Sequence, residues 1–215
     1  MEMNRMIDHT LLKPEATEEQ VRRLVSEALE YHFYSCCVNG FYVPLVHELT
    51  KGSDVRTCCV VGFPLGAMST AAKLAETRDA VAQGTDEVDM VINIGALKEG
   101  KDDFVREEIR QLKEAVGERV LKVIIETCLL TDEEKRRACE LAAQAGADFV
   151  KTSTGFSTGG ATAEDVRLMK ETVGDRCLVK ASGGIHSRAE AIAMVEAGAS
   201  RIGASSGIAI VTARD

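Results

Sequence analysis

The alternation of short apolar runs with amphipathic segments is the feature that most restricts the fold of this chain. Runs such as CCVV (58–61) and MVI (90–92) are hydrophobic on consecutive residues, which is typical of strands covered by helices. Segments that begin with helix-capping residues lie between such runs, as in TEEQ from Thr17 and TDEE from Thr131. Strands that alternate with helices pair in parallel through right-handed crossovers. The pattern therefore predicts an α/β fold.

Roughly eight strand–helix units can be counted along the chain. The expected strands cover residues 6–10, 34–39, 55–61, 87–93, 121–127, 149–153, 178–181 and 201–203. The expected helices cover residues 42–51, 69–83, 102–115, 162–171 and 187–197, with others that begin at Thr17, Thr131 and Ser206. Eight units in a chain of 215 residues favour a single (β/α)8 TIM barrel over a doubly wound sheet. No linker divides the chain, so we expect one domain over residues 1–215.

Charge and hydropathy exclude several classes of function. The net charge is -8 and no basic run offsets it, which argues against broad binding to nucleic acid. No apolar stretch approaches the roughly 18 residues needed to span a membrane, and the start of the chain lacks the apolar core of a signal peptide. We therefore expect a cytoplasmic protein that binds neither nucleic acid nor membranes.

The chain has seven cysteines, an odd number, and no CxxC motif, which argues against a disulfide framework or a zinc site. The adjacent pairs at 36–37 and 58–59 lie in expected strands, where successive side chains face opposite sides. We interpret them as small core residues in a reducing compartment. The four histidines show no ligand spacing, and we expect neither a metal nor another cofactor.

Two lysines at the ends of expected strands are the main candidates for catalysis. Lys151 in FVKTSTG and Lys180 in LVKASGG each stand between an apolar run and a glycine turn. A buried lysine is costly while it is charged, but a neutral lysine is a nucleophile. The active site of a barrel lies at the carboxyl ends of its strands. Strand alternation places Asp89, Lys151 and Lys180 on inward faces, so we expect them to converge on one pocket.

This trio predicts imine chemistry on a carbonyl compound. Lys151 is the expected nucleophile, and the charge of Lys180 favours the neutral form of Lys151. Asp89 can keep Lys180 protonated while it serves, directly or through a water, as acid and base. Two alternatives stay open at this point. Asp89 and Lys180 could form a purely structural ion pair, or each lysine could extend its amine into water.

Two glycine-rich loops predict a phosphate site. SGG (182–184) precedes a helix that begins near residue 187, and GASSG (203–207) precedes the last helix. Barrels of this kind often bind phosphate in the loops after strands 7 and 8, through backbone N–H groups. The candidate phosphate-binding residues are Gly183, Gly184, Ser205 and Ser206. Further substrate-binding candidates at strand ends are Thr10, Thr154 and Cys37, of which Cys37 is a core or pocket-wall thiol.

Eight stretches resemble the deoxyribose-phosphate aldolase family, in the family's order and over nearly the whole chain. They are IDHTLLKP (7–14), CCVN (36–39), VVGFPLG (60–66), EVDMVIN (87–93), KVIIET (122–127), FVKTSTGF (149–156), VKASGGI (179–185) and RIGASSG (201–207). The resemblance implies a metal-independent class I aldolase of the (β/α)8 type. Such enzymes reversibly cleave 2-deoxy-D-ribose 5-phosphate to D-glyceraldehyde 3-phosphate and acetaldehyde in deoxyribonucleoside breakdown.

The resemblance also implies roles for individual residues. Lys151 matches the Schiff-base lysine, Lys180 the second catalytic lysine and Asp89 the proton-shuttling aspartate. The phosphate would lie on the two glycines and two serines named above. We expect phosphorylated sugars and aldehydes as substrates, and a homo-oligomer, either a dimer or a tetramer.

Two departures from the family pattern affect the expected site. Some members carry a phosphate-holding lysine shortly after KTSTG, where this chain has Phe156 and Ser157. Some members end in a tyrosine that reaches the active site, and residues 213–215 contain none, which leaves proton transfer to a water. Three other functions stay open: a Schiff-base aldolase for another sugar phosphate, a sugar-phosphate isomerase with Asp89 as base and no covalent step, and a non-catalytic binding barrel.

Overall fold

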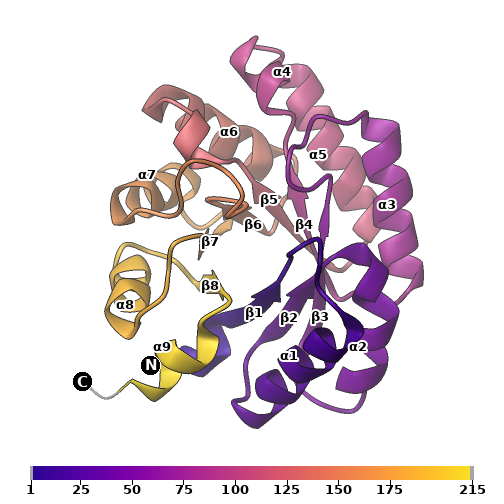
Figure 1. Cartoon of the computed structure of the whole chain (residues 1–215). Helices are drawn as coiled ribbons and strands as arrows, with labels where there is room; N and C mark the ends of the chain where they lie inside the picture. Colours follow the sequence, from indigo (N-terminus) through magenta and orange to yellow (C-terminus); the bar gives the residue numbers. More distant parts are fainter. Residues whose placement is uncertain (1, 214–215) are drawn as a thin grey trace.

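The computed structural model describes residues 2–213, which form a closed barrel of eight strands in chain order (Figure 1). The strands are β1 (Ile7–Leu11), β2 (Ser35–Val38), β3 (Arg56–Val61), β4 (Glu87–Val91), β5 (Val120–Ile124), β6 (Phe149–Lys151), β7 (Leu178–Ser182) and β8 (Arg201–Ala204). Each strand pairs in parallel with the next, and β8 pairs with β1. The predicted (β/α)8 TIM barrel is confirmed.

Helices surround the barrel on the outside (Figure 1). They are α1 (Glu18–Glu30), α2 (Val43–Thr50), α3 (Thr70–Ala82), α4 (Ile94–Lys98), α5 (Asp102–Val116), α6 (Asp132–Gln144), α7 (Ala163–Val173), α8 (Arg188–Glu196) and α9 (Gly207–Thr212). The short helix α4 was not among the expected elements and lies in the connection between β4 and α5. No helix within residues 2–213 is both long enough and apolar enough to cross a bilayer.

Local capping explains where the helices begin and end. At Thr17 the side chain accepts from the Gln20 N–H and the Gln20 side chain accepts from the Thr17 N–H, which is the capping box predicted for α1. Thr131 forms the same reciprocal pair at the start of α6. The predicted stop of α6 is Gly146, whose φ of +83° is a left-handed conformation that glycine adopts without strain.

Strand alternation divides the apolar side chains into two layers. Cys36 and Cys59 belong to the large layer between the barrel and its helices, whereas Cys37 and Cys58 belong to a small cluster inside the barrel. The opposite orientation predicted for each cysteine pair is therefore confirmed. All seven cysteines are free thiols.

The inward faces of four consecutive strands carry charged residues that are in register in two pairs. Asp89 of β4 is in register with Lys122 of β5, and Lys151 of β6 is in register with Lys180 of β7. In a closed barrel these side chains converge on the axis. The barrel thereby concentrates charge in its interior, below the carboxyl ends of the strands.

Candidate active site

Seven charged side chains fill the barrel interior, and we call them the axial network. Its members are Asp8, Glu87, Asp89, Lys122, Lys151, Lys180 and Arg201, and none is more than 5% exposed. They come from six of the eight strands, so only closure of the barrel brings them together. Because each is connected by ion pairs, burial does not leave these charges uncompensated.

Asp89 is the centre of the axial network. Lys151 and Lys180 each donate a hydrogen bond of 2.8 Å from Nζ to Asp89 Oδ2, and Lys122 donates one of 2.8 Å to Oδ1. The structure thus brings together Asp89, Lys151 and Lys180. Burial alone would raise the pKa of Asp89, but the three ammonium groups outweigh burial and hold that pKa well below its usual range. Asp89 is therefore a carboxylate at neutral pH.

Lys180 is held as a cation by two carboxylates. Its Nζ lies 2.5 Å from Asp8 Oδ2 in addition to its contact with Asp89. Burial alone would lower the pKa of Lys180, but Asp8 and Asp89 raise it above its ordinary value. At neutral pH the ammonium of Lys180 therefore remains charged.

The axial network has one more cation than it has carboxylates when every group is ionised. The cations are Lys122, Lys151, Lys180 and Arg201, and the carboxylates are Asp8, Glu87 and Asp89. Within residues 2–213, Lys151 contacts one carboxylate, whereas each other cation contacts at least two. Lys151 is therefore the cation of the axial network with the fewest carboxylate partners.

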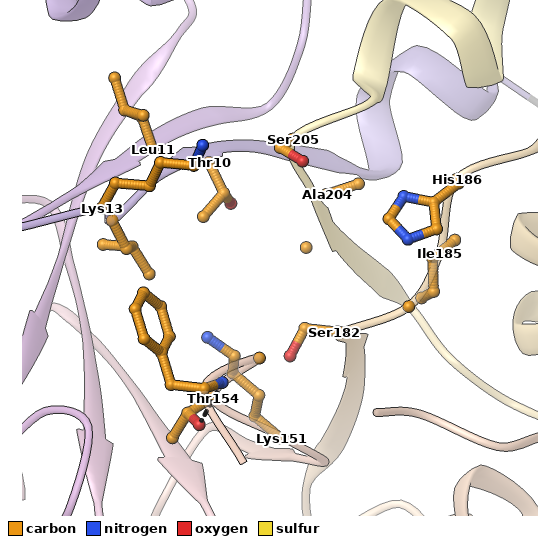
Figure 2. A pocket seen from close by; sticks show the side chains of 16 residues that line it. Thr10, Leu11, Lys13, Lys151, Thr154, Ser182, Ile185, His186, Ala204 and Ser205 are labelled. Carbon is orange, nitrogen blue, oxygen red and sulfur yellow. Dashed lines mark hydrogen bonds between the residues drawn. The ribbon is translucent and has the colours of Figure 1, made fainter. Parts of the chain in front are cut away.

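A cavity of about 460 Å³ lies above the network, at the carboxyl ends of the strands (Figure 2). Lys151 is the member of the axial network that lines it, and Figure 2 shows the Lys151 amine pointing into the open space. Asp89 and Lys180 lie behind it and are fully buried. Five other residues proposed from the sequence also line the cavity: Thr10, Thr154, Gly183, Gly184 and Ser205.

Of the substrate-binding residues proposed from the sequence, two do not line this cavity. Cys37 is fully buried and belongs to the inner cluster with Leu12, which lines the cavity, whereas Cys37 does not. Ser206 has its Oγ 3.4 Å from the Nδ1 of His186, beside rather than within the lining. The position of Cys37 at a strand end did not show that its thiol would be buried away from the cavity.

Hydrogen bonds fix the loops that form the cavity wall. Glu126 accepts from both the N–H and the hydroxyl of Thr154, at 3.1 Å and 2.5 Å, and thereby holds the loop after Lys151. Gly183 has a φ of +85°, and a Cβ added at Gly160 would lie 2.2 Å from the Gly183 carbonyl oxygen. These two loops therefore pack backbone against backbone, which only glycine allows.

Sequence reasoning missed four members of the axial network: Asp8, Glu87, Lys122 and Arg201. Lys122 was within reach, because alternation in KVIIET places Lys122, Ile124 and Glu126 on one face. Nothing local in the sequence pairs Asp8 with Arg201, which lie 193 positions apart and form a contact of 2.8 Å. That pairing depends on closure of the barrel.

One group of potential metal ligands within residues 2–213 overlaps the axial network. The ligand atoms of Cys37, Cys58 and Asp89 lie within 4.8 Å of one another. Both carboxylate oxygens of Asp89 already accept from ammonium groups, and a divalent cation there would face three positive charges. We therefore assign no metal to this group.

Comparison with known proteins agrees with this geometry. The model of the DeoC/LacD family of aldolases matches residues 3–213. A deoxyribose-phosphate aldolase of Finegoldia magna is 60% identical over 211 residues, which cover 98% of this chain and 99% of that protein. Among solved structures, an aldolase called QR15 has a TM-score of 0.93 and 45% identity over 97% of this chain and 93% of its own.

A deoxyribose phosphate aldolase from Aeropyrum pernix, described as tetrameric, has a TM-score of 0.89 and 35% identity. The match covers 97% of this chain and 89% of that chain. Matches at this identity and coverage extend over the barrel and all the loops that line the cavity. The chain therefore belongs to the DeoC/LacD family of aldolases.

Proposed function

We propose that this chain is a class I aldolase for 2-deoxy-D-ribose 5-phosphate, which it reversibly cleaves to D-glyceraldehyde 3-phosphate and acetaldehyde in deoxyribonucleoside catabolism. One observation carries the proposal: the Lys151 amine faces the cavity and shares the Asp89 carboxylate oxygen with the cation of Lys180. The 60% identity to a deoxyribose-phosphate aldolase supports the choice of substrate. The single barrel serves as one catalytic domain.

In the direction of cleavage, the neutral amine of Lys151 attacks C1 of the open-chain sugar phosphate. A bond forms between Nζ and C1, the carbonyl oxygen leaves as water with one amine proton and one proton from a general acid, and a protonated imine remains. The positive charge of this imine replaces the charge of the Lys151 ammonium beside Asp89. The axial network therefore stabilises the intermediate in the place where it held the ammonium.

The protonated imine then accepts the electrons of the broken carbon–carbon bond. A base removes the proton from the C3 hydroxyl, the C2–C3 bond breaks, and D-glyceraldehyde 3-phosphate leaves as the enamine forms on Lys151. Protonation at C2 and addition of water release acetaldehyde and restore the amine. Since Asp89 and Lys180 lie behind Lys151, we assign them to hold and relay protons, with a water that reaches the substrate.

The phosphate lies at the other end of the cavity in this proposal. Gly183, Gly184 and Ser205 line that end, next to Ser206 at the start of α9. Their backbone N–H groups and hydroxyls are donors suited to an anion. Thr10 and Thr154 line the same cavity and are assigned to the substrate hydroxyls.

Covalent trapping tests the proposal directly. Incubation with acetaldehyde and borohydride should attach one ethyl group, which peptide mapping should locate on Lys151. The variant Lys151→Met should carry no adduct, whereas the matched variant Lys73→Met, which removes a buried lysine outside the cavity, should still carry one. Absence of an adduct, or an adduct that survives Lys151→Met, would refute the mechanism.

Substrate comparisons separate the remaining alternatives. A working enzyme that borohydride does not inactivate would be an isomerase with Asp89 as base. Faster cleavage of ribose or ketose phosphates than of deoxyribose phosphate would indicate a Schiff-base aldolase for another sugar phosphate.

We also infer that the chain forms a homo-oligomer and works in the cytoplasm. Phe41 and Leu65 are 85% and 73% exposed, which is unusual for large apolar side chains unless a partner covers them, and one relative is described as tetrameric. Seven free thiols suit a reducing compartment. Light scattering should give a mass above that of one chain, and cell fractionation should recover the protein with cytoplasmic markers.

A further inference from the structure

Lys13 lies at the rim of the cavity, immediately after β1. It lines the same cavity as Gly183, Gly184 and Ser205, which form the proposed phosphate end. Figure 2 shows its side chain extended along the rim, with the amine on the side of Thr10 and Ser205. Sequence reasoning did not select Lys13, because it follows a strand end by two residues and sits in a polar stretch.

The amine of Lys13 has no partner of its own in the part of the chain that the structure describes. No ion pair or hydrogen bond joins it to another side chain or to a carbonyl within residues 2–213. The other lysine in the lining, Lys151, is hydrogen-bonded to Asp89. The third titratable side chain there, His186, faces Ser206. Lys13 is therefore the lysine of the lining whose charge is still available to a ligand.

The charges around the cavity favour an anion at this rim. The sixteen lining residues include no carboxylate, although the chain as a whole has a net charge of -8. Phe156, which also lines the cavity, carries no charge. A phosphate dianion that approaches the glycine loops would thus meet neutral donors on one side and the ammonium of Lys13, which has no carboxylate partner, on the other.

We propose that Lys13 is a substrate-binding residue that closes over the phosphate group of the sugar from the side opposite Gly183 and Gly184. The long, flexible side chain lets the ammonium follow the phosphate as substrate enters and product leaves. Lys13 then contributes to the choice of phosphorylated over unphosphorylated sugars. This inference rests on the proposed function, because it takes the phosphate end of the cavity from that proposal.

The test compares two substrates that differ only in the phosphate. For wild type, Lys13→Gln and Lys13→Arg, kcat/KM is measured with 2-deoxyribose 5-phosphate and with 2-deoxyribose. The ratio of the two values should fall about tenfold in Lys13→Gln, since a charged hydrogen bond of moderate strength is lost. Lys13→Arg should restore most of the ratio. The matched control Lys51→Gln alters an exposed lysine outside the cavity and should leave the ratio unchanged.

A second measurement does not depend on catalysis. Titration with inorganic phosphate should show weaker binding to Lys13→Gln than to wild type and Lys51→Gln, with a smaller difference at high salt. An unchanged substrate ratio together with unchanged phosphate binding would overturn the role of Lys13, as would equal losses with both sugars. If wild type cleaves neither sugar, the proposed function is wrong, and the phosphate titration alone then decides whether Lys13 binds an anion.

Discussion

Lys73 and Lys180 are both fully buried, yet their surroundings shift their pKa values in opposite directions. Lys73 extends from α3 and donates hydrogen bonds of 2.8 Å to Glu108 of α5 and to the Val91 carbonyl. Burial lowers the pKa of Lys73, and the opposing effect of Glu108 is too small to reverse it. For Lys180 burial acts in the same direction, but Asp8 and Asp89 together raise the pKa. The second carboxylate in contact with Lys180 therefore reverses the direction of the pKa shift.

The two regions also differ in what their charges can do. The pair of Lys73 and Glu108 is balanced, and neither residue lines the cavity above the axial network, so it links α3 and α5 to the end of β4. The axial network has a surplus cation, and the least paired of its cations faces a cavity. Buried charge is therefore structural in the first region. In the second, the surplus cation faces the cavity, and it is the group for which we propose covalent chemistry.

Removal of the central carboxylate should have the largest effect. Asp89→Asn leaves Lys151 and Lys180 without their shared acceptor, and kcat for cleavage of deoxyribose phosphate should fall about a thousandfold, as is typical for the loss of a proton-transfer group. Steady-state assays measure this effect, and circular dichroism checks that the variant is folded. Glu108→Gln is the matched control and should retain most of the activity. Comparable losses of kcat in both variants would remove the functional distinction between the two regions.

Disruption of the balanced pair should instead reduce stability. Glu108→Leu leaves the Lys73 ammonium buried without a carboxylate in contact, and the free energy of unfolding should fall by about 3 kcal/mol. The double variant Lys73→Met/Glu108→Leu replaces both charges by apolar groups and should recover most of that loss. Urea unfolding measures both. A double variant that is less stable than Glu108→Leu alone would show that apolar side chains cannot replace the ion pair.

The smallest predicted effect concerns the pH dependence of the free energy of unfolding at alkaline pH, which should have opposite signs for Lys73 and Lys180. Lys73 has a lowered pKa in the native state, so below about pH 10.5 the unfolded chain binds the proton more readily, and stability due to Lys73 rises with pH. Lys180 has a raised pKa, so its contribution is complete below about pH 10.5 and is lost as pH rises further. Each slope is at most about 1.4 kcal/mol per pH unit.

Unfolding of wild type, Lys73→Met and Lys180→Met across this range measures both slopes. The free energy of unfolding of wild type minus that of Lys73→Met should rise with pH below about pH 10.5. The free energy of unfolding of wild type minus that of Lys180→Met should fall with pH above about pH 10.5. Two slopes of the same sign would contradict the opposite pKa shifts on which the comparison rests.

The alternation of residue types was sufficient to predict the barrel and the three central residues. Asp89, Lys151 and Lys180 each stand in a short apolar run, and a period of two places them on the inward face without knowledge of any partner. Lys122 obeys the same rule and could have been found in that way. The seven charges of the axial network could not be assembled from such patterns, because the register between strands decides which inward residues lie at the same height.

The surroundings of Cys37 illustrate a second limit. Alternation predicted that Cys36 and Cys37 face opposite sides of the strand, but it does not show whether an inward side chain reaches the cavity. Leu12, from the loop after β1, belongs to the same buried cluster as this thiol and lines the cavity together with Lys13, whereas Cys37 does not line it. Burial of a particular atom depends on how loops from separate strands pack, and single-strand patterns carry no information on that.

The sequence by itself determined the architecture, the positions of the helix caps and the strands that carry chemistry, because these follow from local periodicity and hydrogen bonding. Only the tertiary structure decided which carboxylate holds which lysine, which lysine reaches the cavity and which residues stay covered. The physical reason is that Coulomb energy and desolvation depend on distances through space. Contacts such as the one between Lys180 and Asp8 exist only after the eight strands have closed.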